Sequence, residues 1–109
     1  MELEEFVKAA FVKMIHEVIT ADGKVHPKEL EMLNKLQKTI GFDDAFLKRT
    51  KHLDYDSALI TLYNLPYEQK KSLAAILDEV AMSDGSIHKK EMDLIIDTFI
   101  NIGIGEESE

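Results

Sequence analysis

The sequence contains no cysteine, no tryptophan and only two prolines among its 109 residues. The lack of cysteine excludes disulfides, thiolate metal sites and cysteine nucleophiles. No apolar run approaches the length needed to cross a bilayer, so we expect no membrane insertion. Residues 1–6 are acidic where a signal peptide would be basic. Together these absences favour a cytoplasmic protein.

Basic residues are also scarce. Only 13 Lys and Arg stand against 21 Asp and Glu, which gives a formal net charge of −8. Proteins that bind nucleic acid neutralise phosphates with clustered lysine and arginine. The short basic stretches at 48–52 and 70–71 lie beside acidic residues, as is typical of solvated faces. We therefore expect no nucleic-acid partner, and we expect any macromolecular partner to be a protein.

Hydrophobic residues make up 45% of the chain and charged residues 31%, a balance typical of a globular protein with a core. A chain of this length has room for a single domain, which we place over residues 1–109. Residues 105–109 form an acidic tail at its end.

The chain repeats itself, because residues 11–42 align with residues 73–104 without a gap. Nine of the 32 aligned positions are identical, whereas average residue usage would give roughly two. A connector over residues 43–72 separates the two repeats. We interpret the repeats as two copies of one helix–acidic turn–helix unit related by a pseudo-twofold axis.

Apolar residues recur at the three- and four-residue spacing of a helix on both sides of each turn. In the first repeat the predicted core residues are Leu3, Phe6, Val7, Ala10, Phe11, Met14, Ile15, Val18, Leu30, Leu33, Leu36 and Ile40. In the second repeat they are Leu73, Ile76, Leu77, Val80, Ala81, Met92, Ile95, Phe99 and Ile102. Gly41 and Gly103 follow the last apolar positions, where a glycine commonly ends a helix.

The connector predicts two short helices. Asp43 or Asp44 can cap the first, and Asp54 or Asp56 can cap the second. Pro66 then ends the second helix and helps to start the next. The sequence therefore predicts an all-α, single-domain bundle of about six helices.

Both turns share the pattern Asp-Gly-x-(Val/Ile)-His-x-Lys-Glu, at residues 22–29 and 84–91. This pattern is similar to the last eight positions of an EF-hand calcium loop. The earlier ligand positions of such a loop hold Val18 and Thr20 in the first repeat, and Val80 and Met82 in the second. We therefore do not expect a tight calcium site of the EF-hand type.

The turns resemble those of the TerB-like (tellurite-resistance) domains more closely. In that family an apolar helix ends in Ala-Asp-Gly and a glutamate opens the next helix, often twice in one domain. This chain has Ala-Asp-Gly at 21–23 with Glu29, and Ser-Asp-Gly at 83–85 with Glu91. The resemblance covers about residues 5–104 and implies an all-helical bundle. At the matching positions it implies these candidate metal ligands: Asp22, Glu29, Asp84 and Glu91.

His26 and His88 precede the two glutamates by three residues, which is one helical turn. Each turn then offers one nitrogen and two oxygen donors, a set that suits zinc or manganese. The histidines are the weaker candidates, and calcium, zinc and manganese are the candidate ions. His16 and His52 lack comparable neighbours, so we expect them on the surface.

A purely structural role would fit the same residues. The glycines permit the left-handed conformation, and the aspartates hydrogen-bond within such turns. The glutamates hold the position of the glutamate in a capping box, and Pro27 holds the first helical position. In this interpretation Val25 and Ile87 insert the turns into the core.

We find no pattern that predicts catalytic residues. The chain has no Glu-x-x-His motif, no glycine-rich phosphate loop and no Gly-x-Ser-x-Gly turn. We expect a non-catalytic TerB-like module that binds a divalent metal, and the resemblance links it to tellurite resistance and other stress responses. One alternative is a protein-binding helical scaffold without metal. Another is a small metalloenzyme, which would need both turns to converge on one cleft.

Overall fold

The computed structural model describes residues 2–83, 85 and 88–104. These residues form six α-helices and a π-helical turn, with no strand among them. In chain order the elements are α1 (Glu5–Ile19), α2 (Pro27–Leu36), η1 (Gln37–Gly41), α3 (Asp44–Thr50), α4 (Tyr55–Tyr63), α5 (Tyr67–Ala81) and α6 (Lys89–Ile102). The expected all-α bundle of about six helices is confirmed. Within the described ranges, no helix is both long enough and apolar enough to span a membrane.

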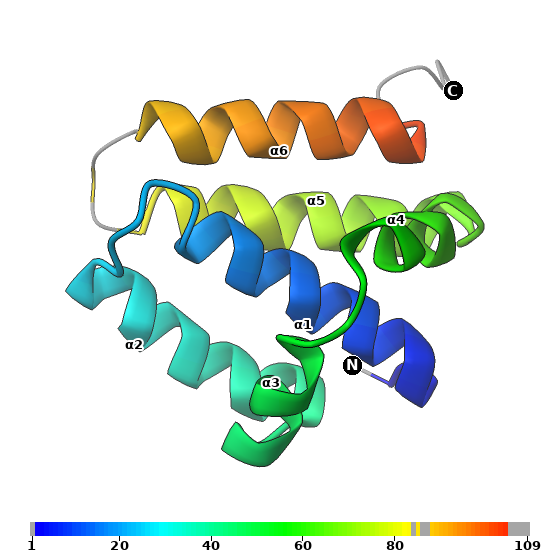
Figure 1. Ribbon diagram of the computed structural model, residues 1–109, viewed down its shortest axis with the longest axis horizontal. Coiled ribbons are helices and arrows are strands. Elements are labelled where there is room, and N and C mark those ends of the chain that lie inside the picture. Colours follow the sequence, from blue (N-terminus) through cyan, green and yellow to red (C-terminus); the bar gives the residue numbers. More distant parts are fainter. Residues whose placement is uncertain (1, 84, 86–87, 105–109) are drawn as a thin grey trace.

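Helix α1 is the central element of the bundle, and α3, α4, α5 and α6 all pack against it (Figure 1). A helix in this position must be apolar on most of its circumference. The buried apolar residues of α1 meet that requirement: Val7, Ala10, Phe11, Val12, Met14, Ile15, Val18 and Ile19. Each fully buried side chain of this size contributes about 1.5–3 kcal/mol of hydrophobic stabilisation. Covering α1 is thus the main source of cohesion in the fold.

The helix ends follow the capping chemistry that the sequence predicts. Asp43 begins α3, and its Oδ1 accepts a hydrogen bond from the Phe46 backbone N–H (2.8 Å). Asp54 rather than Asp56 begins α4, since its Oδ2 accepts from the Ser57 backbone N–H (2.9 Å). Gly103 ends α6 in the left-handed conformation, at φ 87°.

Three residues that were expected in the core lie on the surface: the periodicity placed Phe6 and Leu30 there, and the structural interpretation of the turns placed Val25 there. Phe6 is 61% exposed and borders an open groove beside α3, because it lies in the first turn of α1 at the end of the bundle. Leu30 and Val25 are each 49% exposed. The inward position on α2 belongs to Glu29, so Leu30, about 100° further around the helix, turns towards solvent. Ile87, the counterpart of Val25, lies outside the described residues.

His16 is half-buried on α1 rather than exposed as expected. The neighbouring Lys13 forms an ion pair with Glu17 (3.0 Å) and donates to the Lys51 backbone oxygen (3.2 Å). The pKa of His16 is lowered from its ordinary value, mainly because burial disfavours the imidazolium, and further because of the positive charges of Lys51 and Lys13.

The lowered pKa of His16 predicts a contribution to the pH dependence of stability. The unfolded chain takes up this proton more readily than the folded chain, so stability falls as pH drops from about 6.5 through the lower folded-state pKa. We expect the melting temperature to fall less in His16→Gln than in the wild type between about pH 7.5 and pH 5.5. Thermal melts followed by circular dichroism measure this difference. His52→Gln, at an exposed position, serves as the control, and an equal fall in His16→Gln and the wild type would contradict the assignment.

Candidate metal centre

His26 and His88, the residues that immediately precede α2 and α6, come together at one end of the bundle. The imidazole rings of His26 and His88 stack there, with ring centroids 4.0 Å apart and planes inclined by 11°. These histidines occupy equivalent positions in the two repeats. The structure therefore brings the repeats into contact through the turns, an arrangement that the sequence had left open.

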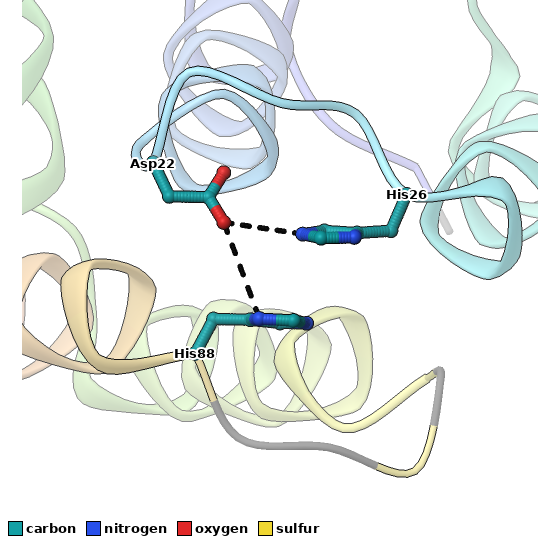
Figure 2. Close-up of side chains that lie close together, drawn as sticks. All are labelled: Asp22, His26 and His88. Atoms are coloured by element: carbon teal, nitrogen blue, oxygen red, sulfur yellow. Dashed lines mark hydrogen bonds and ion pairs between the residues drawn. The ribbon is translucent and has the colours of Figure 1, made fainter.

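The backbone of the first turn is shaped by Gly23 and Asp22. Gly23 has φ 83°, and a Cβ built there would meet no atom within 4 Å, so glycine is favoured here by backbone conformation and not by space. Asp22 Oδ1 accepts a hydrogen bond from the Lys24 backbone N–H (3.1 Å), which closes the turn. This hydrogen bond leaves the second carboxylate oxygen of Asp22 facing the two histidines (Figure 2).

Asp22, His26 and His88 form the outer part of the site. Asp22 Oδ2 lies 3.1 Å from His26 Nε2 and 4.0 Å from His88 Nδ1 (Figure 2). The side chains of all three residues are only about one-fifth exposed. The pKa of Asp22 lies below its ordinary value, chiefly because the His26 side chain, and then the Lys24 backbone N–H, hydrogen-bond to the ionised carboxylate.

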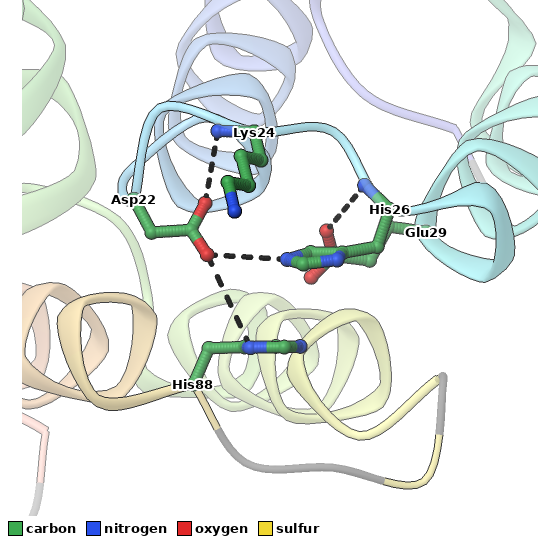
Figure 3. A network of polar contacts seen from close by, with 5 residues as sticks. All are labelled: Asp22, Lys24, His26, Glu29 and His88. Carbon is green, nitrogen blue, oxygen red and sulfur yellow. Dashed lines mark hydrogen bonds and ion pairs between the residues drawn. The ribbon is translucent and has the colours of Figure 1, made fainter.

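Glu29 and Glu91 form the inner part of the site, and both side chains are fully buried. Glu29 Oε1 accepts a hydrogen bond from the His26 backbone N–H (3.4 Å), the glutamate half of the predicted capping box (Figure 3). Glu29 Oε2 is also buried, yet it has no hydrogen-bond partner among the residues that the structure describes. Capping thus accounts for only one of its two oxygens.

The inner residues are close enough to share an ion. One donor atom each from His26, Glu29 and Glu91 lies within 4.8 Å of the other two. Two ionised carboxylates this close together and shielded from water would repel each other, and a cation between them would remove that repulsion. Asp22, His26 and His88 meet the same distance criterion, so His26 belongs to both sets. The arrangement therefore fits a divalent ion.

The structure assembles most of the predicted ligands and changes their ranking. Glu29 and Glu91 lie together with His26, and Asp22 lies in the second group that shares His26, whereas Asp84 lies outside the described residues. His26, predicted as one of the weaker candidates, belongs to both groups, and His88 belongs to the outer group alone. The burial of both glutamates could have been predicted from the sequence, because each lies at helical spacing from the buried residues that follow it. Each glutamate begins an inward stripe with the same spacing: Glu29, Leu33, Leu36, Ile40 and Glu91, Ile95, Thr98, Ile102.

Comparison with known proteins bears on the fold alone. No protein-family model matches the chain, and neither does any curated protein. A crystal structure of a protein of unknown function from Porphyromonas gingivalis W83 matches it with a TM-score of 0.81 and 25% sequence identity. The match covers 95% of this chain and 88% of the other. The bundle architecture therefore occurs in a second protein as well.

The burial of Glu29 predicts an effect on the ion-free protein. In Glu29→Gln the amide oxygen can still accept from the His26 N–H, while the buried carboxylate beside Glu91 is replaced by a neutral group. A buried oxygen without a partner costs about 1–3 kcal/mol, whereas a carboxylate near a helix N-terminus gains about 0.3–1 kcal/mol. We therefore expect Glu29→Gln to be more stable than the wild type by about 1 kcal/mol when a chelator is present.

Urea unfolding of the chelated proteins measures this difference. Glu31→Gln is the matched control, because Glu31 lies on the same helix with a side chain that is 71% exposed. We expect this control to change the free energy of unfolding by less than about 0.5 kcal/mol. A loss of stability in Glu29→Gln would mean that the carboxylate serves the fold as a cap and needs no ion.

Proposed function

We propose that this protein is a non-catalytic TerB-like module that binds a divalent metal ion where its two repeats meet. The observation that carries the proposal is the full burial of Glu29 and Glu91 beside His26, with donor atoms within 4.8 Å of one another. Glutamate is almost never fully buried without a partner for its charge. Glu29 Oε2 has no hydrogen-bond partner among the described residues, and a bound cation would act as the partner of that carboxylate.

The energetics of the ion-free site support the proposal. An apolar side chain at either glutamate position would extend the hydrophobic stripe of its helix, and replacing buried charged groups in this way is often neutral or stabilising. A chain that keeps both acids therefore carries a cost in stability. Local departures of this kind are expected at functional sites, where ligand binding compensates for them.

The biological role rests on the resemblance of the turns to those of TerB-like domains. We propose a role in a stress response. Tellurite resistance, after which the TerB-like domains are named, is one such response. The module would act through protein partners, with the bound ion fixing the arrangement of the two turns. No catalytic step is assigned to it.

A protein-binding scaffold without metal is the second candidate, and two observations favour it. Glu29 caps α2 through the His26 N–H, which is a structural role that needs no ion. Exposed apolar residues also lie on α4 and α6, among them Ile60 and Ile100, which are 62% and 60% exposed. Such residues could contact a partner protein whether or not the turns bind an ion.

Metal binding distinguishes these two candidates. An ion that binds only the folded chain stabilises it by about 2.7 kcal/mol at about 100 times its dissociation constant. For a domain of this size that corresponds to a rise in melting temperature of roughly 10 °C or more. We expect a saturable rise of this order in the wild type with at least one of calcium, zinc, manganese and magnesium. Differential scanning fluorimetry after removal of bound metal provides the measurement.

The rise should disappear in the double variant Glu29→Gln, Glu91→Gln, which keeps the shape of both side chains and removes both charges. Glu31→Gln should respond as the wild type does. A rise that survives in the double variant would place the bound ion elsewhere. No rise with any of the four ions would leave the scaffold function as the better account.

A further inference from the structure

One imidazole is common to every arrangement by which the described residues could hold an ion. The inner set combines His26 with Glu29 and Glu91, and the outer set combines it with Asp22 and His88. An ion bound by either complete set would therefore have a His26 nitrogen in its coordination shell. Imidazole suits zinc, copper, iron and nickel, whereas calcium and magnesium prefer oxygen.

The stacked rings indicate that only one imidazole binds the ion. A ring nitrogen directs its lone pair within the plane of the ring. The His26 and His88 planes are nearly parallel, inclined by 11° with centroids 4.0 Å apart, so one ion cannot lie in both planes. Because His26 alone also approaches both buried glutamates, it is the better ligand, and His88 covers its outer face.

Burial limits the ion further. Calcium takes six to eight oxygen ligands, and magnesium keeps several waters. Glu29 and Glu91 are fully buried, which leaves little room for a hydration shell around an ion between them. Zinc is commonly held by three nitrogen or oxygen ligands and one further ligand. One imidazole and two carboxylates match that requirement.

We infer that the site selects a metal ion that favours imidazole ligands, such as zinc, over calcium and magnesium. The ligands would be His26, Glu29 and Glu91. This inference rests on the proposed function and adds to it the class of ion and the residue that determines the class. Asp22 and His88 are positioning residues: Asp22 holds the His26 ring by its hydrogen bond at Nε2, and His88 holds it by stacking.

The test is a set of calorimetric titrations of the metal-free protein with zinc, cobalt, manganese, calcium and magnesium. We expect zinc and cobalt to bind at a ratio of one ion per chain, at least about tenfold more tightly than calcium or magnesium. Cobalt also gives a spectroscopic readout, because its visible absorption bands change when imidazole enters the coordination shell. The chain has no cysteine, so no thiolate band overlaps them.

His26→Asn is the central variant. Asparagine is a favoured residue immediately before a helix, so it can replace His26 at the start of α2 without disturbing the fold. We expect it to lose zinc and cobalt binding. His88→Asn should weaken zinc binding by about tenfold, as for a residue that supports a ligand. The exposed His52→Asn should bind as the wild type does.

The outcomes separate this inference from the proposed function. If calcium binds as tightly as zinc, and neither affinity changes in His26→Asn, the inference is wrong. The proposed function, binding of a divalent ion, would still stand. No binding of any ion would overturn both. Should His26→Asn fail to fold, ring ¹⁵N chemical shifts of His26 in the wild type decide instead. A large shift on adding zinc supports ligation, and unchanged shifts with zinc bound overturn it.

Discussion

The fold depends on burying α1 on nearly every side. This helix carries more of the fully buried apolar residues than any other, and α3, α4, α5 and α6 each cover part of it. Its counterpart α5 packs beside it, and the C-terminal ends of the two helices lie at the same end of the bundle (Figure 1). The stacking of His26 on His88 is a consequence of that packing, because the helices determine where each turn emerges.

The site places two carboxyl groups at positions that would otherwise belong to the core. On α2 and α6 the first inward-facing residue is a glutamate, and the next inward residues are Leu33 and Ile95. Core positions of this kind ordinarily contribute hydrophobic stabilisation. Here they bring two carboxyl groups to the contact between the repeats, next to His26. Glu29 and Glu91 occupy equivalent positions in the two repeats, and each replaces an apolar core residue. Duplication of one ancestral unit would produce such a matched pair of polar residues.

Much of the fold could be predicted from the sequence because local chemistry and periodicity agreed. The apolar stripe of α1, the aspartate at the start of α3 and the glycine after α6 each specified an element or its end. Where the prediction failed, the tertiary context decided. Phe6 has the spacing of a core residue but lies at the end of the bundle. On α2 the buried position holds Glu29 and not the neighbouring Leu30, although leucine is the more usual core residue.

The candidate site was predictable in part. The resemblance of the turns to those of TerB-like domains implied Asp22, Glu29, Asp84 and Glu91 as candidate ligands, but no spacing within one repeat could show that the two repeats meet at His26 and His88. That contact depends on how α1 and α5 pack, which is a property of the whole bundle. The central position of His26 follows from it, since only the stacked arrangement places one imidazole beside carboxylates of both repeats.

We propose that one ion lies between the two repeats, bound by His26, Glu29 and Glu91. The most direct measurement is a crystal structure of the protein grown with zinc, with anomalous diffraction data collected at the zinc absorption edge. We expect one strong anomalous peak about 2.0–2.2 Å from a His26 nitrogen and from an oxygen of each glutamate. Zinc found only on exposed side chains, with no peak between the buried glutamates, would contradict it.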